Sequence, residues 1–338
     1  IAPDGEPYPY ADSIEFRPIP DGQVRNQALQ SGDINIMHSS NAKDIGNKFY
    51  DLREAGKANM FVSEEQAEVS FIQLNTTQPP FDDPRMRKAL AMGADLEDVN
   101  TIMNDGLPTL AKGPYGPDSI GYVEDTGFPA YDLEAATKLV DEYVAEGGSP
   151  EFTLHSTTDA SVKKLAELTQ TRAEKVGVKV TIVERDQAAM VNDAIGKKYQ
   201  AMLFRNYPGG DPDSLYVWFY SGTKNDDGTL SSNLVNFAGV KDDEVDRLLD
   251  EGRSEPDADK RKEIYQDLDR VMGSEVYGVW SWFTPWAVVA QPDVHNIIGP
   301  PLPGEDITQK GETTTDDPAL QPNLGLATGH SLIGLWVK

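Results

Sequence analysis

The sequence predicts an α/β fold built around a parallel sheet. Strand and helix patterns alternate in the middle of the chain, at residues 151–156, 160–176, 178–183, 187–195 and 199–204. Short connections between alternating strands and helices are typical of parallel strands covered by helices. The 338 residues exceed the usual size of one hydrophobic core, which favours two lobes or one elaborate domain. Ligands of parallel sheets bind outside the carboxyl ends of the strands, so the residues after Phe204 are candidates for a site.

The residues before this alternation predict further strands and two helices. Runs of alternating or continuous apolar residues indicate strands at 13–17, 34–37 and 67–74. A helix with Val24 and Leu29 on its apolar face ends near Gly32. A second helix begins where Asp83 supplies a cap and Pro84 occupies the first turn.

The elements on either side of the alternation are defined by caps and periodicity. Asp132 caps a helix that Gly147 and Gly148 stop. Beyond Phe204 we expect an aromatic helix at 215–220, amphipathic helices at 242–252 and 257–272, and a strand at 275–290. A Gly-, Pro- and Thr-rich stretch then runs from 292 to about 324, and the chain finishes with an apolar segment at 332–337.

Composition excludes several classes of protein. Fifty-six acidic and thirty basic residues give a formal charge of −26, which repels phosphate backbones and anionic membranes and makes nucleic acid an unsuitable partner. The absence of cysteine removes disulfides, thiolate nucleophiles and cysteine-based metal sites. No apolar run has the roughly 20 residues that a membrane-spanning helix needs, and the first residues lack the pattern of a signal peptide.

Four groups of short motifs occur in a characteristic order. They are YADSIEFR at 10–17 with QSGDI at 30–34, LNT at 74–76 with PFDDPRMRKAL at 80–90, GGDPDS at 209–214, and DEVDRLL at 243–249 with KRKEIY at 260–265. In this order and spacing the chain resembles extracellular solute-binding protein family 5, the peptide, nickel and opine class of receptors that feed ABC importers.

The resemblance implies a fold and a mode of action. The fold is a type II periplasmic-binding-protein-like architecture, with lobe I at 1–72 and 284–338 and lobe II, which binds the solute, at 73–283. The two lobes are expected to close around the ligand by a hinge motion. Family members usually carry a large amino-terminal part before the motif at 10–17. We therefore expect the first lobe to be incomplete and the sequence to be a truncated form, with a naturally short homologue as the alternative.

The resemblance also implies partners and location. The expected role is to capture an oligopeptide or dipeptide for ABC transporter permease subunits in the membrane, as a monomeric binding protein that is not an enzyme and needs no cofactor or metal. The location would be periplasmic or extracellular, with tethering through an amino-terminal lipid anchor. A non-peptide ligand such as an opine, a sugar or a metal chelate is the alternative, and a purely structural cell-surface protein is a further one.

The first candidate site residues follow the strand at 199–204. In peptide-binding members of the family, an Asp three residues before the Asp-Pro-Asp motif holds the ligand's ammonium group, and a Trp lies three residues earlier. Here these positions are Pro208 and Arg205. Arg205 offers a planar donor fork suited to a carboxylate or phosphate, or it forms a structural salt bridge. Asn206 and Tyr207 either face the ligand or organise the turn.

Three further candidates lie on the strands that the resemblance assigns to the hinges. Trp280 and Trp282 are expected on one face of their strand, where they either stack on a ligand or pack between the lobes. Asn75 either binds ligand backbone or organises a turn. These three residues complete the predicted ligand-binding set.

Catalytic interpretations have weaker support. The four histidines at 38, 155, 295 and 330 show no metal-ligand spacing, and no nucleophile-elbow, phosphate-loop or dinucleotide motif is present. Asp211 and Asp213 are expected to cap the following helix. The alternative is a hydrolase that uses these two carboxylates as a pair.

Overall fold

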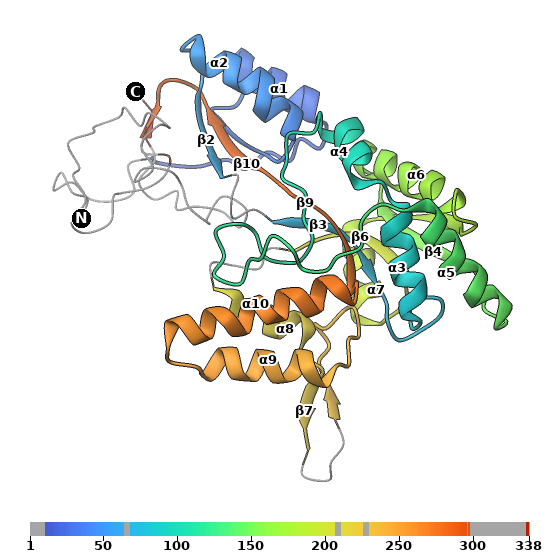
Figure 1. Ribbon diagram of the computed structural model, residues 1–338. Helices are drawn as coiled ribbons and strands as arrows, with labels where there is room; N and C mark the ends of the chain where they lie inside the picture. The colour runs from blue at the N-terminus through green and yellow to red at the C-terminus, as the bar shows by residue number, and fades with distance from the viewer. Residues whose placement is uncertain are drawn as a thin grey trace. The chain divides into compact units, whose positions relative to one another are not determined.

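The computed structural model describes residues 11–63, 68–206, 211–225, 230–295, 297 and 336–337. The chain divides into two compact units, each described separately below (Figure 1). Unit 1 comprises residues 1–67 and 284–338, and unit 2 comprises residues 68–283. The chain passes between the two units at 67–68 and at 283–284.

Unit 2 is built on a five-stranded sheet in the order β5-β4-β6-β3-β9. The strands are β3 (Val69–Leu74), β4 (Glu151–Thr157), β5 (Lys179–Arg185), β6 (Ala201–Asn206) and β9 (Gly278–Phe283). Strand β4 is parallel to β5 and to β6, which confirms the predicted parallel arrangement of the central alternation. Strand β3 is antiparallel to both β6 and β9, so the sheet as a whole is mixed.

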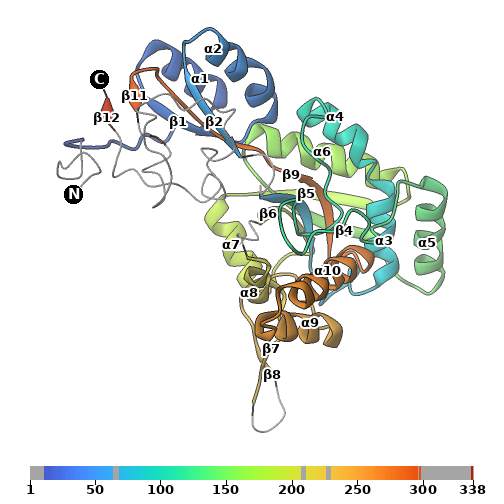
Figure 2. The same ribbon diagram turned by 60° about the vertical axis from the view of Figure 1, so that its left-hand side comes forward.

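Helices cover both faces of this sheet (Figure 2). The helices are α3 (Pro84–Gly93), α4 (Leu96–Asn104), α5 (Leu133–Ala145), α6 (Ala160–Glu174) and α7 (Gln187–Ile195). Helices α3, α5 and α6 share one core cluster with Leu154 and Leu203 of the sheet. Met202 belongs to a separate cluster with Met190 of α7. Because successive strand residues point to opposite faces, β6 contributes to both layers.

Aspartate caps explain where eight of the α-helices in the described part of the chain begin. In each, the carboxylate accepts a backbone N–H of the first turn. The capping residues are Asp21, Asp83, Asp95, Asp132, Asp159, Asp186, Asp242 and Asp257. Each such cap contributes about 1 kcal/mol of stability. Part of the acidic excess of the chain therefore stabilises helix ends.

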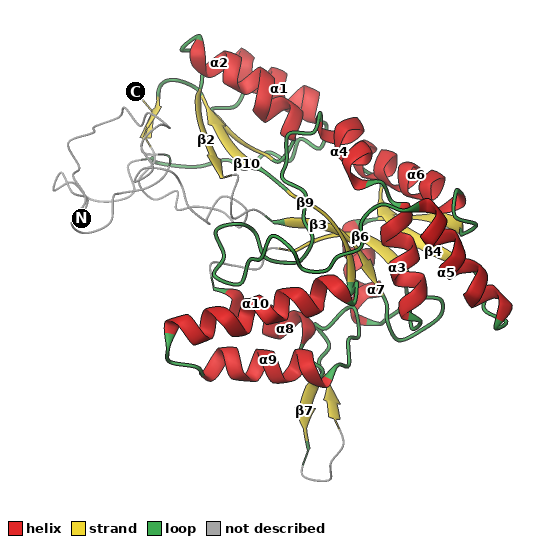
Figure 3. Cartoon of the chain, viewed as in Figure 1, coloured by secondary structure: helices red, strands yellow, loops and turns green. Residues whose placement is uncertain are grey.

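The last part of unit 2 is a helical extension beside the sheet (Figure 3). A 3₁₀ helix (Pro212–Leu215) and α8 (Tyr216–Phe219) lead into the β7–β8 hairpin (Gly222–Lys224 and Leu230–Ser232). Helices α9 (Asp243–Ser254) and α10 (Ala258–Ser274) then run side by side, as Figure 1 shows. The predicted helices at 242–252 and 257–272 are thereby confirmed within two residues.

Unit 1 contains a three-stranded antiparallel sheet in the order β1-β10-β2. Its elements are α1 (Gly22–Ser31), β1 (Ile36–Ser39), a π-helix (Asp44–Phe49), α2 (Tyr50–Glu54), β2 (Asn59–Ser63), β10 (Trp286–Ala290), β11 (Val294–His295) and β12 (Trp336–Val337). Leu29 and Phe49 pack with Met60 and Val289 in one buried cluster. The predicted helix ending near Gly32 is confirmed, because Gly32 forms its left-handed carboxyl cap.

Two predicted strands of this region were wrong. Residues 13–17 form no strand, and Phe16 is 78% exposed. The predicted strand at 275–290 is two strands in different sheets, because Pro285 interrupts it between β9 and β10. Of the carboxyl-terminal predictions at 292–324 and 332–337, nearly all residues lie outside the described ranges.

One buried carboxyl joins a long loop to α10. Asp269 is 1% exposed, and its Oδ2 accepts the Val123 N–H at 3.1 Å. A Cβ at Gly113 would lie 2.2 Å from Asp269 Oδ1, so this close approach requires glycine. Burial raises the pKa of Asp269 to about 8, although hydrogen bonds from the N–H groups of Val123 and Tyr115 partly oppose this effect.

We expect Asp269 to make stability pH-dependent. In the unfolded chain its carboxyl has the usual pKa of about 4, so between about pH 4 and pH 8 unfolding releases a proton. The free energy of unfolding should therefore fall as pH rises, by at most about 1.4 kcal/mol per pH unit. Asp269→Asn removes this titration. The Tm of Asp269→Asn minus that of the unmodified protein should therefore rise from pH 4 to pH 8, whereas the same quantity for Asp267→Asn, on the exposed side of α10, should not follow this course. Parallel profiles for both variants would contradict the expectation.

Candidate functional site

The carboxyl ends of the parallel strands lie along one edge of the sheet of unit 2. Strands β4, β5 and β6 run in the same direction and end at Thr157, Arg185 and Asn206. The antiparallel strand β3 begins at this edge, where Val69 pairs with Asn206 on one side and with Phe283 on the other. We call the edge defined by these five residues the carboxyl edge. Both crossings of the chain between the two units, at 67–68 and at 283–284, adjoin it.

Arg205 lies at the carboxyl edge with its charge partly exposed. It pairs with Ser70 of β3, and 39% of its side chain is exposed. Its Nη1 lies 3.6 Å from Oε2 of Glu68, whose side chain is 18% exposed. Arg205 is therefore accessible and also forms a salt bridge, and its role in ligand binding stays a prediction.

A second carboxylate lies within electrostatic range of Arg205. Asp159 follows β4 and accepts the backbone N–H groups of Ser161 and Val162 at 2.9 and 3.2 Å. Burial raises the pKa of Asp159, but the hydrogen bond from the Ser161 hydroxyl and those from the two backbone N–H groups, with a smaller contribution from the positive charge of Arg205, outweigh burial and leave the pKa below its usual value. Strand β6 lies between β4 and β3. Arg205 is thus accompanied by carboxylates that come from the chain segments on both sides of its own strand.

Of the residues that follow Arg205 in the sequence, the structure describes Asn206 but not Tyr207 or Pro208. Asn206 is 7% exposed and pairs with Val69, so it is a largely buried residue of the sheet. Tyr207 lies outside the described residues, as does Pro208. The predicted roles of Asn206 and Tyr207 in ligand binding stay predictions.

The two tryptophans of β9 are buried in unit 2. Trp280 is 1% exposed, its Nε1 donates to the Met272 carbonyl oxygen at 3.3 Å, and its ring centroid lies 4.8 Å from that of Phe71. Trp282 is 6% exposed and forms a β-bridge with Leu110. Trp280 packs as a core residue, whereas Trp282 lies one residue from the end of β9 at the carboxyl edge.

Asn75 lies at the opposite end of β3. It is fully buried, and its Nδ2 donates to the carbonyl oxygens of Tyr199 and Lys197 at 2.8 and 3.3 Å. Its Oδ1 accepts the Thr77 N–H at 3.1 Å. These contacts match the turn-organising role considered for Asn75. Arg205 lies opposite Ser70, and Asn75 lies five residues further along the chain, which is about 17 Å in an extended strand. The structure therefore does not bring Asn75 and Arg205 together.

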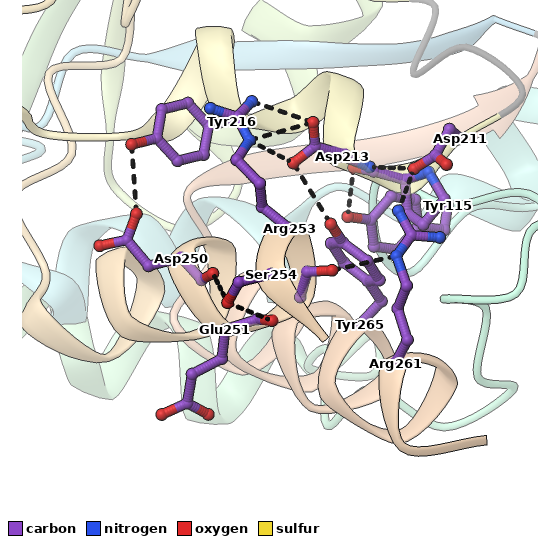
Figure 4. A network of polar contacts seen from close by, with 12 residues as sticks. Tyr115, Asp211, Asp213, Tyr216, Asp250, Glu251, Arg253, Ser254, Arg261 and Tyr265 are labelled. Atoms are coloured by element: carbon purple, nitrogen blue, oxygen red, sulfur yellow. Dashed lines mark hydrogen bonds and ion pairs between the residues drawn. The ribbon is translucent and has the colours of Figure 1, made fainter. Parts of the chain in front are cut away.

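The Asp-Pro-Asp motif forms a polar network with α9 and α10 (Figure 4). Asp213 makes a bidentate ion pair with Arg253, with N–O distances of 2.9 Å, and accepts the Tyr265 hydroxyl at 3.3 Å. Asp211 pairs with Arg261 at 2.5 Å and caps the 3₁₀ helix by accepting the Asp213 N–H. The expected capping role is confirmed for Asp211.

This network does not have the character of a carboxylate pair for hydrolysis. Burial raises the pKa of Asp211, but hydrogen bonds from Arg261 and from the Asp213 N–H outweigh burial and lower the pKa overall. Each carboxylate is neutralised by its own arginine. A general acid needs a raised pKa and an accessible proton, which this arrangement opposes.

The described histidines form no metal site. His155 is 4% exposed and lies 3.4 Å from Asp193, and His38 packs on Trp286 with ring centroids 4.6 Å apart. Within the described ranges, no group of three or more His, Asp or Glu side chains is placed to hold a metal ion. The His295 side chain and His330 lie outside the described part of the chain.

Glu68 and Asp159 are neighbours of Arg205 that sequence reasoning missed. Glu68 lies within the predicted strand at 67–74, and Asp159 immediately precedes the predicted helix at 160–176. Their sequence signals are those of a charged strand start and an ordinary helix cap. Neither signal indicates that Arg205, 137 residues from Glu68 and 46 from Asp159, will lie near both.

The mixed sheet with helices on both faces and two chain crossings to a second unit defines a two-lobed α/β binding-protein architecture. Residues 4–227 match the family model described as bacterial extracellular solute-binding proteins, family 5 middle. The chain therefore belongs to this family, and the resemblance noted from the sequence motifs is confirmed. The family is one of binding proteins, in agreement with the prediction that the chain is not an enzyme.

Relatives and solved structures agree with this membership. The probable di/tripeptide-binding protein 5 of Pseudomonas aeruginosa is 24% identical over 313 residues, which cover 90% of this chain and 54% of that protein. The chain thus spans about half the length of the curated relatives it matches.

Two structures show the same fold. DppA from Helicobacter pylori in complex with peptide STSA has a TM-score of 0.71 and 21% identity, covering 83% of this chain and 53% of its own. PBP AgaA from A. tumefacien R10 in complex with agropinic acid has a TM-score of 0.70 and 22% identity, covering 82% of this chain and 55% of its own.

In the described part of this chain, every helix is too short or too polar to cross a lipid bilayer.

We expect the Asp213 ion pair to stabilise unit 2. Asp213→Asn removes the negative charge that Arg253 and Tyr265 share, so the free energy of unfolding should fall by about 1–2 kcal/mol. Glu142→Gln, which removes an exposed pair with Lys138 at 4.0 Å, should change it by less than about 0.5 kcal/mol. Urea unfolding of both variants tests this difference, and equal effects would refute the structural role of the network.

Proposed function

We propose that the chain is the solute-binding component of an ABC importer and that its ligand is an oligopeptide or dipeptide. Membership of the family and the di/tripeptide-binding relative support this proposal. The proposed binding site is the carboxyl edge of unit 2. The main observation in its favour is that Arg205 has a partly exposed guanidinium there, beside Glu68. A guanidinium at the end of a sheet strand suits the carboxylate of a peptide.

A non-peptide anion is the second candidate ligand. The structure of AgaA in complex with agropinic acid has the same fold, and Arg205 is equally suited to the carboxylate of an opine. In both cases the ligand must carry an anionic group that contacts Arg205.

The proposal includes how the ligand is held and where the protein acts. Lobe I would comprise 1–72 and 284–338, lobe II would comprise 73–283, and the lobes would close on the ligand. Arg205, Asn206, Tyr207 and Trp282 form the proposed ligand-binding set, with Arg205 and Trp282 the best supported by their position at the carboxyl edge. The buried contacts of Trp280 and Asn75 favour the packing and turn roles that were the alternatives for them. Delivery to permease subunits as a monomer, a periplasmic location and a lipid anchor belong to the same proposal.

Substitution of Arg205 tests the anion contact. Thermal shift with a panel of dipeptides, oligopeptides and opines should identify stabilising compounds, and titration calorimetry should then show that Arg205→Ala weakens their binding by about tenfold or more. Arg270→Ala is the matched control. Arg270 lies on α10, pairs with Asp267 at 2.7 Å and has a 50% exposed side chain, compared with 39% for Arg205.

The control should bind within about twofold of the unmodified protein, because α10 contributes no residue to the carboxyl edge. Equal affinity of Arg205→Ala would remove the anion contact from the proposal. Mass spectrometry of the recovered compound should show an unchanged mass, and any turnover would favour the hydrolase alternative.

A further inference from the structure

A long loop of unit 2 runs from the sheet to α10. Residues 109–126, between α4 and α5, contain no helix and only the single β-bridge of Leu110. We call this segment the strap, and Figure 1 shows it passing between β9 and α10. Loops longer than about 15 residues without secondary structure are uncommon in compact domains and are usually functional or disordered. Because this one is anchored at defined points, its anchors show which part of it can move.

The first part of the strap is fixed by the sheet and by a buried tyrosine. The Ala111 N–H donates to the Ser281 carbonyl oxygen of β9 at 3.1 Å. Tyr115 is 1% exposed, and its hydroxyl donates to the Pro212 carbonyl oxygen at 3.0 Å. Burial raises the pKa of Tyr115 further above its usual value of about 10, so neither contact changes its charge between pH 5 and pH 8.

The second part of the strap is held to α10 by two side chains. Gln266 Nε2 donates to the Tyr122 carbonyl oxygen at 3.3 Å, and Asp269 Oδ2 accepts the Val123 N–H at 3.1 Å. Most of residues 117–125 are exposed or half-buried, so little apolar burial adds to these two hydrogen bonds. Of the two side chains, Asp269 is the one that titrates. The attachment of this part therefore depends on the protonation state of Asp269.

The surroundings of the Asp269 carboxyl favour its neutral form. It is 1% exposed, and no cationic side chain among the described residues forms an ion pair with it. Arg270 partly opposes the effect of burial on the pKa of Asp269, but its guanidinium pairs with Asp267 at 2.7 Å. The other ionisable groups that face Asp269 are Tyr115 and Tyr122, which are neutral when protonated and whose pKa values burial raises. A buried carboxylate without a cation is costly, so the charged form is destabilised while the strap covers it.

The strap backbone closes over the other oxygen of this carboxyl. A Cβ at Gly113 would lie 2.2 Å from Asp269 Oδ1 and 3.0 Å from its Cγ. The carboxyl regains hydration only when the strap moves away, and its pKa then returns from about 8 to about 4. Between these pH values opening of the strap releases a proton, so opening becomes more favourable as pH rises.

We propose that Asp269 is a pH-operated latch: its protonated carboxyl holds residues 117–125 of the strap on α10, and loss of the proton releases them while the strap stays attached to β9. The device concerns one loop rather than the whole of unit 2, because the anchors at Ala111 and Tyr115 do not titrate in this range. The inference goes beyond the proposed function and does not rest on it, since no ligand takes part.

Amide hydrogen exchange at pH 5, 6, 7 and 8, corrected for the intrinsic exchange rate, tests the latch. The protection factor of the Val123 amide should fall by up to about tenfold per pH unit, because each opening releases one proton. At each pH it should be at least about 100-fold below that of the Ala111 amide, because the strap opens without unfolding of the sheet. Equal protection of the two amides would show that they open together, and would overturn the inference.

Three substitutions test whether Asp269 is the group responsible. In Asp269→Asn the side chain stays neutral and can still accept the Val123 N–H, so Val123 protection should vary less than about twofold from pH 5 to pH 8. Gly113→Ala should lower Val123 protection at pH 5 by at least about tenfold, because its Cβ displaces the strap. Asp267→Asn, the matched control on the exposed side of α10, should keep the pH dependence of the unmodified protein. The inference is wrong if Asp269→Asn keeps the pH dependence or if Asp267→Asn loses it.

Discussion

The structure of unit 2 depends on the insertion of β3 between β6 and β9. Every residue of β3 is buried, so its backbone N–H and C=O groups need partners within the sheet. These partners come from strands that lie more than 120 residues further along the chain. The pairing is antiparallel on both sides, and its register sets Ser70 opposite Arg205 and opposite Trp282. The composition of the carboxyl edge is a consequence of this register.

The carboxylates of unit 2 cap helices and form ion pairs. Asp159 both caps α6 and lowers the local potential beside Arg205, while Asp211 and Asp213 are neutralised by arginines of α9 and α10. A surface that only kept the protein soluble would not need such pairing. Many carboxylates of this acidic chain are therefore committed to helix caps and ion pairs.

Local signals predicted the helices better than the strands. Caps such as Asp132 and Asp257 act through backbone groups three or fewer residues away, so they are visible in the sequence and begin helices where expected. The strand expected at 13–17 had the right alternation, yet it has no partner strand among the described residues. The interpretation of 275–290 as one strand missed the break at Pro285 and the bulge opposite Ser70 and Phe71, which changes how Trp280 and Trp282 are presented.

The sequence by itself determined the α/β class, the parallel direction of β4, β5 and β6, most helix boundaries and the family. The class, the strand directions and the helix boundaries follow from periodicity and capping, which act over a few residues. The family follows from ordered motifs, which can be compared with those of known families. Only the tertiary structure decided that Glu68 and Asp159 accompany Arg205, that Trp280 is part of the core and that Asn75 closes a turn at the far end of β3. Those outcomes depend on which distant strands pair and in what register, and pairing free energy comes from burial and hydrogen bonds that no short segment contains.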